Sequence, residues 1–136
     1  MKMKNTPPAG REHEVGNLAP QIMTLDLNRE IEQLRSEARW QSGHTAKTLA
    51  KYPDFRVVLI VMHAGGRLEK HQTGGRISIQ ALEGQIRLHT AERSVDLTAG
   101  QLLMLESNIP HDVEGITDSA LLLTIAWPAA TRPSGD

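Results

Sequence analysis

The sequence lacks several features that would point to particular kinds of protein. It has no cysteine, which excludes a disulfide framework and a thiolate site. Its 15 basic and 16 acidic residues give a net charge of −1, so it lacks the basic excess typical of nucleic-acid binding. No run approaches the roughly eighteen apolar residues of a membrane helix, and the N-terminus has no apolar stretch of signal-peptide length. We therefore expect a cytoplasmic protein without nucleic-acid or membrane partners.

A chain of 136 residues most simply forms one domain. Residues 1–24 are polar and contain several prolines and glycines, which predicts a flexible N-terminal arm. Residues 25–44 are expected to form a helix and a connection that pack on the main domain. The domain itself is predicted to span residues 45–128, followed by a C-terminal tail over residues 129–136.

The segment 26–39 has the pattern of a one-sided helix. Its apolar residues recur at helical spacing, at Leu27, Ile31, Leu34 and Ala38. Charged residues fill most of the other positions, and Asp26 is suited to cap the N-terminus. Because only one face is apolar, we expect this helix to lie on the outside of another element.

From Leu49 onward the pattern is that of short β-strands. The run 57–62 is apolar throughout and is bounded by Pro53 and Gly65, which predicts a strand covered on both faces. Turn-forming residues separate further strand-like segments, which are residues 76–82, 85–89, 94–97, 101–105, 112–115 and 120–127. Many short strands at such spacing predict an all-β sandwich or barrel.

Two of the glycine-punctuated segments contain a histidine at a distinctive spacing. His71 lies six residues after Gly65, and His111 lies eleven residues after Gly100. This spacing resembles the two motifs of the cupin superfamily, over about residues 45–127. The resemblance implies an all-β jelly-roll barrel (a double-stranded β-helix) of the RmlC-like type, with one N-terminal α-helix. It also implies that the two histidines point into the barrel.

The resemblance is incomplete at the family's metal site. Thr73 stands where the family has a second histidine, and Ile77 where it has an acidic residue. The resemblance therefore implies a degenerate site, and we predict no cofactor. An iron, zinc, manganese or nickel ion could bind if Glu69 joined His71 and His111 as a substitute ligand, because a non-haem iron site takes two histidines and one carboxylate. The alternative is that Glu69 belongs to a solvated loop.

Side-chain parity predicts where the pocket lies. Successive residues of a strand point to opposite faces, so in an extended chain Glu69, His71 and Thr73 share one face. Arg76 has the opposite parity and is expected to point outward. An apolar wall with a few convergent polar groups is typical of a small-molecule site, and the predicted pocket residues are His71, Thr73, Ile77, Ile79 and His111.

Three functions fit such a pocket. The first, which we favour, is a module that binds a small organic molecule. The second is a metal-dependent cupin enzyme of the dioxygenase or isomerase type, with His71, His111 and Glu69 as ligands. The third resembles the metal-free cupin sugar epimerases, which pair a histidine base with a tyrosine acid; the one tyrosine here is Tyr52, in a predicted turn. Whether the chain is an enzyme stays open.

The apolar strands also bear on assembly. The run 57–62 and residues 121–123 are apolar on both faces. Packing of their second faces against another subunit would make the protein a homodimer. The alternative is that the helix 26–39 covers these faces.

Overall fold

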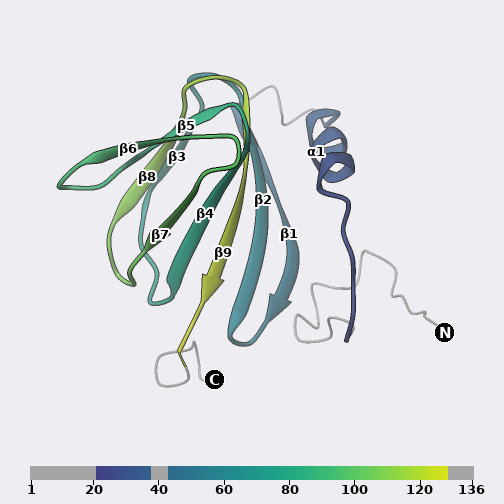
Figure 1. The fold of residues 1–136 in the computed structure, drawn as a ribbon, viewed down its shortest axis with the longest axis horizontal. Helices are drawn as coiled ribbons and strands as arrows, with labels where there is room; N and C mark the ends of the chain where they lie inside the picture. The colour runs from purple at the N-terminus through teal and green to yellow at the C-terminus, as the bar shows by residue number, and fades with distance from the viewer. Residues whose placement is uncertain (1–20, 38–42, 129–136) are drawn as a thin grey trace.

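The computed structural model describes residues 21–37 and 43–128, which form two antiparallel sheets and one helix (Figure 1). The larger sheet has five strands, in the order β1 (His44–Tyr52), β2 (Phe55–Met62), β9 (Ser119–Ala126), β4 (Arg76–Glu83) and β7 (Leu102–Leu105). The smaller sheet has four, in the order β3 (Arg67–His71), β8 (His111–Gly115), β5 (Gln85–His89) and β6 (Ser94–Thr98). The predicted all-β jelly-roll barrel with one helix is therefore confirmed.

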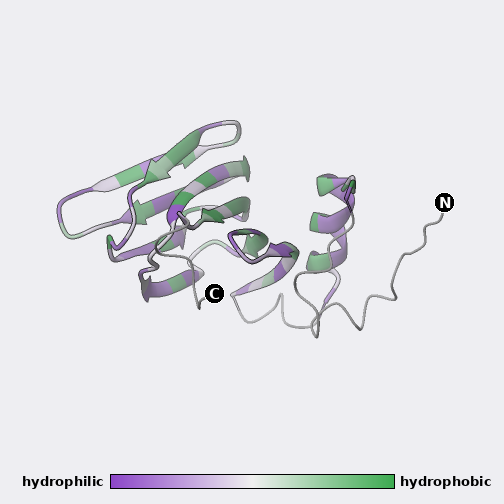
Figure 2. Ribbon diagram, turned by 90° about the horizontal axis from the view of Figure 1, so that it is seen from below, coloured by the Kyte–Doolittle hydropathy of each residue, from purple (hydrophilic) through white to green (hydrophobic). Residues whose placement is uncertain are grey.

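The barrel core is built from residues that alternate along the strands. On β4, Ile77, Ile79 and Ala81 are buried, while Ser78 and Gln80 between them are half-buried on the opposite face. The same alternation appears as bands of opposite hydropathy along the ribbons (Figure 2). Complete burial of an aliphatic side chain contributes about 1.5–3 kcal/mol. The burial of Ile77, Ile79 and Ala81 therefore fixes the register of β4 with its neighbouring strands, because a shift of one residue would turn all three side chains to the outer face.

Helix α1 (Leu27–Arg35) begins where the sequence predicts. The side chain of Asp26 caps it by accepting the backbone N–H of Arg29 at 3.3 Å. The helix ends earlier than predicted because Ser36 caps its C-terminus, donating its hydroxyl to the Gln33 carbonyl at 2.7 Å. In the described part of the chain, no helix is long and apolar enough to cross a membrane.

Helix α1 covers part of the outer face of the larger sheet (Figure 1). Ile31 and Leu34 are 2% and 3% exposed, and they pack in one cluster with Leu59, Val61 and Ala120. The second face of the apolar run in β2 is therefore buried within the chain, as the alternative interpretation expected. This removes the argument for a homodimer that rested on that face, and the homodimer stays a prediction.

Strands β1 and β3 are not among the predicted strands. In β1 the buried residues are Thr45 and Leu49, four apart, so the sequence shows no period-two apolar signal there. The strand lies at the edge of the sheet, where only one neighbour pairs with it. The predicted arm and tail, residues 1–24 and 129–136, fall almost entirely outside the described residues.

Candidate functional site

His111 is a buried polar residue inside the barrel. It begins β8, is 1% exposed, and its Nδ1 lies 3.0 Å from the carbonyl oxygen of Ile109. A carbonyl only accepts hydrogen bonds, so Nδ1 carries the hydrogen and Nε2 keeps the lone pair in the neutral ring. The turn before β8 is fixed by the backbone N–H of Asn108, which donates to the carbonyl of Thr73 at 2.8 Å. His111 is thereby held beside the segment that follows β3.

The backbone of His71 lies directly opposite His111 across β3 and β8. Its side chain lies outside what the structure describes. Between Leu68 and His71 the register shifts, so that two residues of β3 oppose one residue of β8. Such a bulge breaks the alternation of faces, and the Glu69 side chain is exposed. The assumption that Glu69 shares a face with His71 required an unbroken strand, and the bulge removes it.

The other predicted pocket residues differ in their environment. Thr73 is half-buried, and its hydroxyl oxygen accepts the backbone N–H of Gly75 at 3.3 Å. Ile77 and Ile79 are buried in the core, 2% and 1% exposed. Among the residues whose side chains are described, no three His, Asp or Glu come together as a metal site would require. They therefore do not supply the full ligand set, and the role of His71 in binding a metal stays a prediction.

The barrel is more open at one end than at the other. On the inner face of the larger sheet, Ile60 and Leu121 are buried, whereas Val58, Leu123 and Ile125 are only half-buried although they pack on the same core. Strand β8 ends and β9 begins at the short turn that joins them, so the start of β8 and the end of β9 both lie far from this turn, at the same end of the barrel. The buried His111 therefore lies at the open end.

A continuous cross-strand row crosses the larger sheet at this open end. Residues directly opposite each other on antiparallel strands share a face, and in order across the sheet the row consists of Lys51, Arg56, Ile125, Ile77 and Leu105. Ile125, Ile77 and Leu105 pack on the core, so the whole row belongs to the inner face.

Arg56 is the inward residue that the sequence reasoning missed. Its guanidinium carbon lies 5.1 Å from the ring centroid of Trp127. Its Nε is buried without a hydrogen-bond partner. The sequence analysis assigned no role to Arg56, which directly precedes the apolar run 57–62. Its spacing could have identified it: Arg56 lies two residues before Val58 and four before Ile60, so along a strand it shares their inner face.

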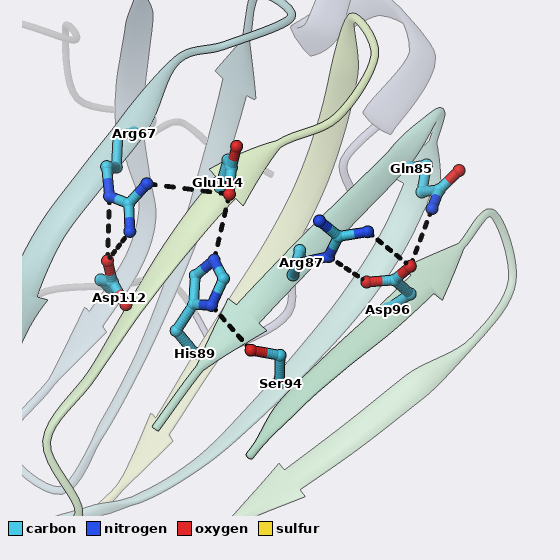
Figure 3. Close-up of polar contacts among 8 residues, drawn as sticks. All are labelled: Arg67, Gln85, Arg87, His89, Ser94, Asp96, Asp112 and Glu114. Carbon is cyan, nitrogen blue, oxygen red and sulfur yellow. Dashed lines mark hydrogen bonds and ion pairs between the residues drawn. The ribbon is translucent and has the colours of Figure 1, made fainter. Parts of the chain in front are cut away.

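The outer face of the smaller sheet carries a separate polar network (Figure 3). The guanidinium of Arg67 lies 2.7 Å from the carboxylate of Asp112 and 3.7 Å from that of Glu114. The ring of His89 bridges two side chains, with Nε2 lying 3.0 Å from Glu114 and Nδ1 lying 2.8 Å from Ser94. The hydrogen bond from His89 is the main cause that lowers the pKa of Glu114, and the Arg67 charge lowers it further. Because these groups satisfy one another and lie on the outside, the network joins strands and forms no pocket.

Two hollows are lined mainly by residues outside the predicted pocket. One, of about 540 Å³, is formed mainly by the loop around His63 and by His44. Asp118 lies beside it, accepting the backbone N–H of Ala64 at 2.9 Å and lying 3.5 Å from Nδ1 of His63. The other, of about 320 Å³, lies beside β4 and the end of β9, and Ile77 is the predicted pocket residue that borders it.

Comparison with solved structures identifies the fold. A cupin superfamily protein from Desulfitobacterium hafniense is 20% identical, with a TM-score of 0.67 over 80% of this chain and 94% of that one. An RmlC-like cupin from Desulfovibrio desulfuricans is 23% identical, with a TM-score of 0.63 over 77% and 97%. A conserved protein of unknown function from Streptococcus pyogenes is 19% identical, with a TM-score of 0.64 over 82% and 93%. No family model and no curated protein sequence matches the chain.

Proposed function

Starting from a chain with the cupin fold, we propose that this protein binds a small organic molecule at the open end of its barrel, without the complete cupin metal site. The observation that carries the proposal is the half-buried inner face beside the buried His111. An apolar surface that faces inward yet remains partly open can be covered by a ligand. Burial of its exposed area would stabilise the complex by about 25 cal/mol per Å².

The composition of the open end supports a small-molecule site. Apolar side chains from the larger sheet form one wall, and His111 and Thr73 provide polar groups near it. Such sites combine apolar lining with a few polar groups that fix the orientation of the ligand. Ile77 stands where the resemblance places an acidic ligand, and its buried hydrocarbon side chain supports binding that does not depend on the full metal site.

A pair of adjacent substitutions on β7 tests this proposal. Leu103 packs on the core from the inner face, whereas Leu102 is 57% exposed on the outer face. We expect Leu103→Trp to fill the open end and abolish fragment binding in an NMR titration, and Leu102→Trp to leave it unchanged. Thermal unfolding of both variants checks that they fold. Fragment-induced shifts that cluster away from the open end, or equal effects of the two variants, would contradict the proposal.

A metal-dependent enzyme of the dioxygenase or isomerase type is the second candidate, because the register places His71 directly opposite His111. Elemental analysis of protein purified without chelator decides between the two. We expect well under one equivalent of iron, zinc, manganese or nickel. A stoichiometric metal that is lost in both His71→Ala and His111→Ala would favour the enzyme instead.

The epimerase-like alternative finds no support in the position of Tyr52. This residue lies opposite Phe55, and the two rings are 6.3 Å apart between centroids. Phe55 lies two residues before Val57 and four before Leu59, so it shares their face of β2. Val57 and Leu59 pack in the cluster beneath helix α1 on the outer face. Tyr52 therefore lies on the face opposite to His111, so we do not assign it the role of an acid.

A further inference from the structure

Two cationic residues lie next to each other on the inner face at the open end. Lys51 on β1 is directly opposite Arg56 on β2, and Arg56 is directly opposite the core-packing Ile125 on β9. Like charges directly opposite each other destabilise a sheet. The juxtaposition is therefore unfavourable for the chain alone, and a negative charge placed between the two groups would relieve it.

Arg56 has no acidic partner among the described residues, unlike most cations on the strands and on α1. Most arginines and lysines on the strands and on α1 pair with a carboxylate at 3.0 Å or closer, and the paired residues are Arg35, Lys47, Arg67, Arg76 and Arg87. Among the described residues no carboxylate pairs with Arg56 or Lys51, and the Nε of Arg56 is buried without an acceptor. A half-buried guanidinium that the protein leaves unpaired is a candidate for pairing with a ligand.

The surroundings of Arg56 define the shape of that ligand. The Trp127 ring lies 5.1 Å from the guanidinium carbon and occupies one face of the cation. The terminal N–H groups in the guanidinium plane are the donors that match a carboxylate. Beyond Arg56 the row continues as hydrocarbon, with Ile125, Ile77 and Leu105.

We propose that Arg56, assisted by Lys51, binds the carboxylate of a small organic acid whose apolar body lies along the half-buried Ile125 and Leu105 of the same row. This inference rests on the proposed function and specifies the chemical class of its ligand. Arg56 selects for charge through its paired donors, and the aliphatic row selects against small inorganic anions, which have no apolar surface to bury. Lys51, which is exposed, contributes longer-range attraction.

Matched acid and amide probes test the inference. Hexanoate and hexanamide have the same hydrocarbon chain and differ in charge, so their affinities at pH 7, from calorimetry or NMR titration, isolate the contribution of the carboxylate. We expect hexanoate to bind about tenfold more tightly than hexanamide, as a charge-assisted hydrogen bond would give. Arg56→Gln should abolish this preference by weakening hexanoate alone.

Two variants control the experiment. Arg76→Gln removes an arginine that lies on the outer face of the same sheet and pairs with Glu106 at 3.0 Å, and we expect it to leave both affinities within about twofold. Arg56→Lys keeps the charge but loses the paired donors, so it should retain a reduced preference for hexanoate. It also keeps the inference testable if Arg56→Gln fails to fold.

The outcomes separate this inference from the proposed function. If hexanamide binds as tightly as hexanoate, or if Arg56→Gln and Arg76→Gln have equal effects, the carboxylate assignment is wrong while binding at the open end stands. Competition by inorganic phosphate as strong as that by hexanoate would also overturn the assignment, because the apolar row would then play no part. If neither probe binds, both are overturned.

Discussion

Replacement of Gly84 with alanine should destabilise the closed end of the barrel strongly. Gly84 joins β4 to β5 with a φ of +74°, and a Cβ atom there would collide with the carbonyl oxygen of Asp118. It would also lie 2.8 Å from the Thr117 hydroxyl oxygen and 3.0 Å from the Ser119 Cα. Two of these three neighbours are backbone atoms of the turn between β8 and β9, which cannot move without displacing both strands.

The magnitude follows from a comparison with Gly100. Gly100 also has a positive φ, of +92°, but no atom lies within 4 Å of its would-be Cβ. An alanine with positive φ costs about 1–2 kcal/mol, partly offset by about 0.4–1 kcal/mol of lost unfolded-state entropy, so Gly100→Ala should cost about 1 kcal/mol. Gly84→Ala adds a collision that costs about 1–3 kcal/mol more. The difference between the two variants therefore isolates the collision.

Urea unfolding followed by circular dichroism measures both variants. With a slope of roughly 1.5 kcal/mol per M, a difference of about 2 kcal/mol separates their midpoints by about 1.3 M. Equal midpoints for Gly84→Ala and Gly100→Ala would refute the reasoning, since backbone conformation alone would then account for both losses.

Two further predictions concern charge and assembly. The backbone N–H of Ala64, and then His63, lower the pKa of Asp118, so its stabilisation is present above the unfolded-state pKa and is lost as the pH falls through the folded-state value. The difference in urea midpoint between wild type and Asp118→Asn should therefore shrink below about pH 4, and a difference that stays constant with pH would contradict this assignment. If the protein is a homodimer, light scattering at micromolar concentration should give twice the mass of one chain. Leu102 and Met104, which are 57% and 67% exposed, are apolar residues available to the interface. A mass of one chain would contradict the prediction.

Patterns along the chain predicted those parts of the fold that depend on neighbouring residues. The alternation of Ile77, Ile79 and Ala81 is visible in the sequence, and all three are buried on one face. The helix was equally predictable, since Ile31 and Leu34 recur at helical spacing and both are buried. β1 was not predictable, because an edge strand that buries two residues four apart carries no period-two signal.

The candidate site was only partly predictable for the same physical reason. His111 is recognisable from its spacing, and its burial at the open end is consistent with the predicted pocket. Arg56 was missed because an arginine beside an apolar run usually lies in solvent. Its inward direction depends on pairing with Ile125, about seventy residues later in the chain. For Glu69, the bulge between β3 and β8 interrupts the alternation on which its predicted placement depended, and such a bulge leaves no local mark in the sequence. Its role as a ligand stays a prediction.

The sequence by itself determined the all-β class, the helix and most of the strands, because periodicity and glycine spacing are properties of adjacent residues. Only the tertiary structure decided which faces meet. Register across strands set Lys51 beside Arg56 on the inner face, turned Tyr52 outward and exposed Glu69. Cross-strand pairing joins residues distant in the chain, and a shift of one residue reverses every side chain. The chemistry of the open end therefore depends on tertiary pairing.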